Sequence, residues 1–115
     1  MKLIQNVTAD PTQQQTLILD DGTRIDFTMY FRPMMYGWFF EKLVYGDFVL
    51  NSSRIVTSPN MLQQYKNVIP FGIACYTSDK QEPKLLQDFS SGYAKLYLLS
   101  AAEVIQLSEY LSGQG

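Results

Sequence analysis

The feature that most constrains the fold is an Asp-Gly turn followed by an alternating segment. The run Asp20-Asp21-Gly22-Thr23 contains the residue pair that accepts the positive φ angles of a tight hairpin turn. After the turn, large apolar residues occupy every second position from Ile25 to Phe31. A period of two is typical of a strand with one buried and one solvated face. Because the segment before the turn, Thr16–Leu19, is also β-prone, the sequence predicts an antiparallel hairpin.

Further β-prone segments, separated by turn residues, extend through most of the chain. The tract Gln13-Gln14-Gln15 is expected in a polar loop, and Ser58-Pro59-Asn60 is expected to begin one helical turn. Pro33 ends the alternating strand because proline lacks an amide donor. Besides the hairpin, we expect strands within residues 2–8, 38–45, 48–50, 54–57, 71–77 and 93–99.

The periodicity of the hydrophobic residues changes in the last part of the chain. Ser100 and Glu103 have the spacing of a capping box, and Val104, Leu107 and Leu111 then share one helical face. This pattern predicts an amphipathic helix over residues 101–111, ending at Gly113. A helix of about eleven residues is marginal in water, so its apolar face should pack on the chain's own sheet or on a partner. Packing on its own sheet is the commoner arrangement.

These segments predict one domain over residues 1–115, with the strand core at about 2–99 and the helix at about 101–111. The expected fold class is mainly β: a small antiparallel β-sandwich or half-open barrel with one C-terminal α-helix. With 115 residues, 46% of them hydrophobic, the chain can build a single compact core.

The composition removes several classes of function. The chain has no histidine and one cysteine, so the usual ligands of zinc, copper and iron and the Ser-His or Cys-His nucleophiles are missing. We therefore expect no enzyme, no catalytic residue, no metal and no cofactor. Cys75 lies in an apolar run and is expected in the core. A net charge of −2 argues against nucleic-acid binding.

Two further expectations concern membranes and carboxylates. The sequence lacks an uninterrupted apolar run of the roughly 18 residues that a spanning helix needs, and its start lacks the apolar stretch of a signal peptide, so we expect no membrane contact and a cytoplasm-like compartment. Asp20, Asp21 and Asp26 could suggest a cation site or an acid–base pair. Their spacing favours the alternative of turn-forming aspartates.

Aromatic residues make up 14% of the chain, more than a core of this size readily holds. One cluster, Tyr36, Trp38, Phe39, Phe40 and Tyr45, could stack on sugars, but core and subunit-interface positions are the commoner roles of such residues. Trp38 is expected in the core. The candidate interface residues are Tyr36, Phe39, Tyr45, Val104, Leu107 and Leu111.

The order of landmarks resembles the small baseplate plug family of contractile-tailed cyanophages. The match covers roughly residues 16–98 and rests on turn glycines and strand aromatics in a fixed order. The landmarks are Leu19-Asp20-Asp21-Gly22, Trp38, Val44-Tyr45-Gly46-Asp47, Leu50-Asn51, Leu62, Tyr65, Pro70-Phe71-Gly72, Pro83, Gly92 and Leu96-Tyr97. The sequence departs from the family pattern at Met34-Met35, in a turn that is usually more polar, and at the helix after Ser100.

The resemblance implies a virion protein of the tail baseplate, assembled in the host cytoplasm and placed near the tail axis. Its implied partners are the tube, hub and sheath-initiating proteins and copies of itself. The family contributes no catalytic position. The alternative is a carbohydrate-binding or receptor-binding accessory module of a phage tail, which would need several coplanar exposed aromatics. A small hydrolase or transferase would need convergent carboxylates in a pocket, for which Asp20, Asp26 and Glu41 are the candidates.

Overall fold

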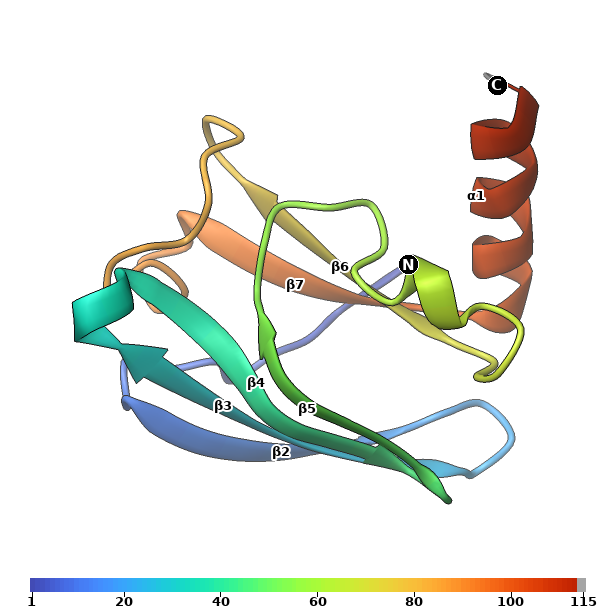
Figure 1. Ribbon diagram of the computed structural model, residues 1–115, viewed down its shortest axis with the longest axis horizontal. Helices are drawn as coiled ribbons and strands as arrows, with labels where there is room; N and C mark the ends of the chain where they lie inside the picture. Colours follow the sequence, from blue (N-terminus) through green and yellow to red (C-terminus); the bar gives the residue numbers. More distant parts are fainter. Residues whose placement is uncertain (114–115) are drawn as a thin grey trace.

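The computed structural model describes residues 1–113 and confirms the predicted fold class: two antiparallel sheets and one C-terminal helix. Figure 1 shows the two sheets as layers, with the helix at one end of the molecule. The elements are β1 (Lys2–Leu3), β2 (Thr12–Ile18), β3 (Arg24–Arg32), the 3₁₀ turn η1 (Pro33–Met35), β4 (Gly37–Tyr45), β5 (Phe48–Arg54), the 3₁₀ turn η2 (Gln63–Tyr65), β6 (Gly72–Thr77), β7 (Ala94–Leu99) and α1 (Ala101–Gly113).

The larger sheet is a meander in the order β2-β3-β4-β5, and the smaller one has the order β1-β7-β6. The turn after Leu19 joins β2 to β3, as the Asp-Gly pair predicts, and Gly22 there has φ of +84°. A long connection after β5 crosses to the smaller sheet. Its backbone pairs with the free edge of β6 through Ser58 and Cys75, so that this edge is partly covered.

The core lies between the two sheets. In β3, Ile25, Phe27 and Met29 are buried, as their alternation predicts. From β4, Trp38 packs edge-on against Phe89, with ring centroids 5.6 Å apart. The other sheet contributes a set of buried apolar residues that includes Ile73, Cys75, Ala94, Leu96 and Leu99.

A register irregularity shifts the burial pattern in the middle of β4. Phe40 pairs with Met29 and Lys42 pairs with Thr28, so Glu41 has no partner in β3. The extra residue shifts the alternation by one position. Phe40 and Leu43 are therefore both buried, although they are three residues apart, and the intervening Glu41 is exposed.

Two sequence predictions are corrected by the strand pairing. The Gln13–Gln15 tract belongs to β2 and not to a loop, because all three residues pair with β3. Gln13 also accepts a hydrogen bond from the Thr8 amide at 3.0 Å, which secures the entry to the strand. The strand predicted at 48–50 continues through Asn51–Ser53 to Arg54 as the single strand β5, and residues 55–57, predicted as part of a second strand, lie outside it.

Cys75 is buried in β6, as predicted, and is a free thiol. Burial, with a smaller effect of the Glu82 charge, raises the pKa of its thiol to about 12. The thiol is therefore protonated at neutral pH, and a protonated, buried thiol is a poor nucleophile.

Candidate interaction surface

The most prominent exposed apolar feature is the connection between β3 and β4, residues 33–36, which we call the hairpin tip. Met34 and Tyr36 expose 91% and 71% of their surface, and Met35 is about half exposed. In Figure 1 the hairpin tip, drawn as the short helical turn between β3 and β4, lies at the end of the long axis opposite α1. Large apolar side chains gathered on a protruding segment are typical of protein–protein contact sites.

The hairpin tip is held in one conformation by a fork of hydrogen bonds from β5. Arg54 donates through Nη1 to the carbonyl of Met35 at 3.3 Å and through Nη2 to the carbonyl of Tyr36 at 3.0 Å. Gly37 leaves room for this arrangement, since a Cβ there would lie 2.7 Å from Nη2. The tip thus presents its side chains on an ordered backbone, which lowers the entropy that binding must offset.

A stack of cations and rings supports the base of the hairpin tip. The guanidinium carbon of Arg32 lies 4.5 Å from the ring centroid of Tyr30, and that of Arg54 lies 5.5 Å from the centroid of Phe39. The two rings are themselves 5.8 Å apart. Such cation–π contacts contribute roughly 0.5–1 kcal/mol each at exposed sites. The two arginines are therefore fixed beside the tip.

Tyr36 has a strained backbone. Its φ and ψ are both 50°, the left-handed region that bulky side chains rarely adopt. The conformation persists because the Tyr36 amide donates to the Pro33 carbonyl at 3.2 Å and the Tyr36 carbonyl accepts a hydrogen bond from Arg54. Strain retained at an exposed position, where glycine would fit, points to a role for the side chain beyond folding.

We expect Tyr36→Gly to raise the free energy of unfolding by about 1 kcal/mol, because glycine adopts positive φ without the steric cost that tyrosine has. Thermal melting measures the change. Ser53→Gly on β5 is the control, and it should lower the melting temperature because Ser53 is not among the positive-φ residues. A Tyr36→Gly variant that melts below the wild type would contradict the assignment of strain.

The structure brings together only part of the predicted interface. Tyr36 is at the tip, as described. Phe39 is 7% exposed, because Arg32 and Arg54 lie beside its ring, so it supports the tip from within and offers no contact surface in the monomer. Tyr45 is half-buried at the far end of β4, with its ring centroid 5.3 Å from that of Phe71. It is therefore separate from the tip.

The predicted face of α1 is divided between the chain's own core and solvent. Val104 is buried, Leu107 is half-buried and Leu111 is 41% exposed. Gln63 from η2 donates to the Ser108 hydroxyl at 2.9 Å and ties the middle of the helix to the body. Only the first turns of the helix thus pack on the domain, and Val104 is unavailable to a partner.

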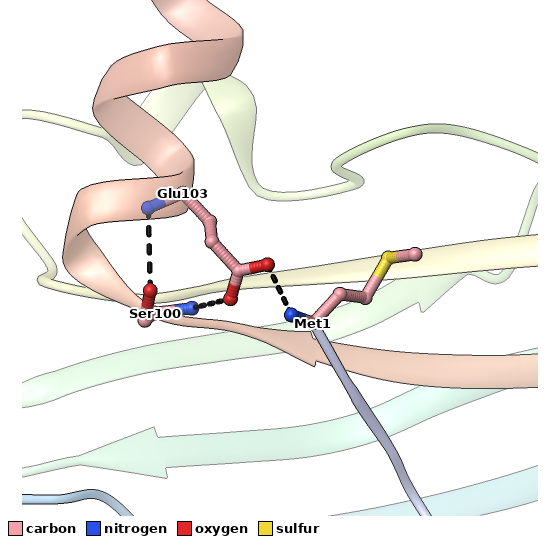
Figure 2. Close-up of polar contacts among 3 residues, drawn as sticks. All are labelled: Met1, Ser100 and Glu103. Carbon is pink, nitrogen blue, oxygen red and sulfur yellow. Dashed lines mark hydrogen bonds and ion pairs between the residues drawn. The ribbon is translucent and has the colours of Figure 1, made fainter.

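The predicted capping box forms at the start of α1 (Figure 2). The Ser100 hydroxyl accepts from the Glu103 amide at 3.2 Å, and the Glu103 carboxylate accepts from the Ser100 amide at 3.0 Å. The second carboxylate oxygen contacts the Met1 ammonium group. The ammonium contact, followed by the Ser100 amide, lowers the pKa of Glu103 below its ordinary value of 4.5.

The lowered pKa of Glu103 sets a direction for pH dependence. A depressed pKa means that the ionised group stabilises the fold above pH 4.5 and that this contribution is lost as pH falls through the folded-state pKa. Glu103→Gln keeps a hydrogen-bond acceptor and removes the charge. We expect its melting temperature at pH 7 to lie slightly below that of the wild type. The corresponding decrease in the free energy of unfolding is less than about 1 kcal/mol. The melting temperatures of the variant and the wild type should converge as the pH is lowered from 7 to 3. A difference that stays constant with pH would contradict a stabilising role of the Glu103 charge.

The carboxylates considered for catalysis are not brought together. Asp26 accepts a hydrogen bond from the Thr16 hydroxyl at 2.6 Å and pairs with Arg24 on the outer face of the larger sheet. Asp20 lies in the turn after β2, and Glu41 is exposed at the irregularity in β4. Within residues 1–113, no group of three carboxylate or cysteine side chains could hold a metal ion. The helices of this part of the chain include none that is long and apolar enough to cross a membrane.

The sequence reasoning missed Met34, Arg32 and Arg54 as site residues. The adjacent methionines after Pro33 were a usable signal, because two large apolar residues are unusual in a hairpin connection. The role of Arg54 could not be read from the sequence, because its fork crosses from β5 to a segment 18 and 19 residues earlier.

Comparison of the chain with models of known protein families gives no match, and no curated protein matches it in sequence.

Proposed function

We propose that this protein is a non-enzymatic structural subunit of the baseplate of a contractile phage tail, a plug-like component near the tail axis. It would bridge tube, hub and sheath-initiating proteins. The observation that carries the proposal is the hairpin tip: exposed Met34 and Tyr36 on a backbone fixed by Arg54. Ordered apolar anchors of this kind suit permanent contacts between subunits. The resemblance of the sequence landmarks to the plug family is the reason for proposing a tail baseplate as the assembly.

The exposed apolar residues support an assembly role over a catalytic one. Besides the hairpin tip, α1 exposes Ile105, Tyr110 and Leu111 at the other end of the molecule. A subunit that contacts neighbours at both ends can transmit a displacement between them. In the proposed mechanism these contacts hold the baseplate before contraction, and their loss accompanies its rearrangement.

The alternative, a carbohydrate-binding or receptor-binding accessory module, has weaker support. Sugar stacking needs several flat rings exposed side by side, and three rings of the aromatic cluster are buried. These rings belong to Trp38, Phe39 and Phe40. Tyr36 remains exposed, but the half-buried Tyr45 lies at the far end of β4. A glycan array with the purified protein tests this alternative directly.

The proposal is tested on particles produced from the genome that encodes this chain. Mass spectrometry of purified particles should find the chain, and immunogold labelling should place it at the end of a contractile tail. Particles that lack the chain, or a label confined to the capsid, would contradict the proposal. Labelling at fibre tips, together with a glycan-array signal, would favour the receptor-binding module.

A further inference from the structure

We propose that the hairpin tip of one copy docks into an apolar hollow at the opposite end of a second copy, so that the chains associate head to tail. The occupant of the hollow is thus this same protein. The inference deepens the proposed assembly role and rests on it for the identification of the tip as a contact surface. It adds the two surfaces through which copies of the chain meet, which the assembly role alone leaves undefined.

The first half of the contact is positively charged. Arg32 and Arg54 are fixed beside the tip by the Tyr30 and Phe39 rings. The ion pairs found among residues 1–113 are Met1–Glu103 and Arg24–Asp26, so neither tip arginine has a carboxylate partner. A chain with a net charge of −2 therefore carries two uncompensated cations around its most exposed apolar side chains.

The second half has the complementary chemistry. Between the β2–β3 turn and the start of α1 lies a hollow of about 370 Å³, which has the volume of roughly a dozen water molecules. Its lining is apolar with an acidic rim: Leu19, Asp20, Asp21, Pro70, Ser100, Ala101 and Ala102. Asp20 makes no ion pair, and the nearby Met1 ammonium is already bound to Glu103. An apolar side chain could enter the hollow while the arginines approach the aspartates.

The positions of the two surfaces dictate the type of association. The nine residues of β3 separate the hairpin tip from the β2–β3 turn by roughly 26 Å, at a strand rise of about 3.3 Å per residue. Figure 1 shows the tip and the turn at opposite ends of the long axis. A tip cannot reach the hollow of its own chain, and contacts between different surfaces build rings or filaments and not two-fold dimers.

The test uses two variants of the full chain, each of which removes one half of the contact. Met34→Glu places a negative charge on the tip, and Asp20→Arg reverses the charge at the hollow while leaving the Asp21 carboxylate, which accepts from the Thr23 amide at 2.9 Å, in place. Val49→Glu, a change of an exposed apolar residue of β5 that lines neither this hollow nor the depression beside it, is the matched control. Circular dichroism verifies the fold of each variant, and sedimentation velocity measures association.

The wild type and Val49→Glu should associate as concentration rises, less so at high salt because charge pairs are screened. Each contact variant should associate at least about tenfold more weakly, as expected for loss of a central contact. An equimolar mixture of Met34→Glu and Asp20→Arg should form dimers at concentrations at which neither variant alone does, because one intact tip then meets one intact hollow.

Three results would overturn the inference. The first is a wild type that remains monomeric at every concentration. The second is a mixture that behaves as the separate variants do. The third is a monomer that binds anionic phospholipid vesicles through Met34, which would make the tip a lipid contact. If the wild type is monomeric and yet enters tail particles in a Met34-dependent manner, head-to-tail docking fails while the proposed assembly role stands.

Discussion

Trp38→Ala should lower the free energy of unfolding by about 3–5 kcal/mol, as large-to-small substitutions of buried aromatics do. Trp38 is fully buried, and its ring contacts Phe31 and Phe89 with centroids 5.5 and 5.6 Å away. Its indole Nε1 also donates to the Leu85 carbonyl at 3.1 Å, which ties the connection before β7 to the larger sheet. Truncation would therefore leave both a cavity and an unsatisfied carbonyl.

Thermal melting measures the Trp38 effect, with an expected decrease of at least about 10 °C for a domain of this size. Tyr110→Ala, which removes an exposed ring from α1, is the matched control and should change the free energy of unfolding by no more than about 0.5 kcal/mol. If Trp38→Ala melted with the wild type, the indole could not be part of the core, and the sugar-stacking alternative would regain support.

Asn60→Ala should lower the free energy of unfolding by at least about 2 kcal/mol, since it would leave two buried amides without an acceptor. The Asn60 Oδ1 accepts from the amide of Leu62 at 2.9 Å and from that of Ile73 at 3.1 Å. It thereby joins the connection after β5 to β6, where a Cβ at Gly72 would lie 2.5 Å from this oxygen. Few residues could replace asparagine in so confined a position.

Chemical denaturation of Asn60→Ala gives the free energy, and Asn51→Ala on the exposed part of β5 is the control. The control should differ from the wild type by no more than about 0.5 kcal/mol. Equal midpoints for the two variants would show that the Asn60 hydrogen bonds contribute little to stability.

The sequence predicts the fold where local patterns decide it. The Asp-Gly turn, the alternation in β3 and the capping box at Ser100 each act within a few residues, and each is confirmed. The β4 irregularity and the single strand β5 depend on pairing between strands, which no local pattern contains. The Gln13–Gln15 tract was placed in a loop for the same reason, since polar residues are tolerated in β2 at the edge of the sheet.

The candidate site is harder to predict than the fold. Tyr36 was selected as an aromatic residue near a turn, and it proves exposed. Phe39 was selected from the same aromatic cluster and Val104 from the apolar face of the helix, but tertiary packing buries both. Which apolar residues remain outside the core depends on the position of the whole β3–β4 hairpin relative to β5. The fork from Arg54 and the hollow beside α1 likewise arise from segments distant in sequence.

A cryo-EM map of the intact tail end of particles encoded with this chain would show whether the hairpin tip is a contact surface in a tail assembly. We expect density for this two-sheet fold near the tail axis, with Met34 and Tyr36 covered by a neighbouring subunit. A map in which the fold is present but both side chains face solvent, or in which the fold is absent from the tail, would contradict this expectation.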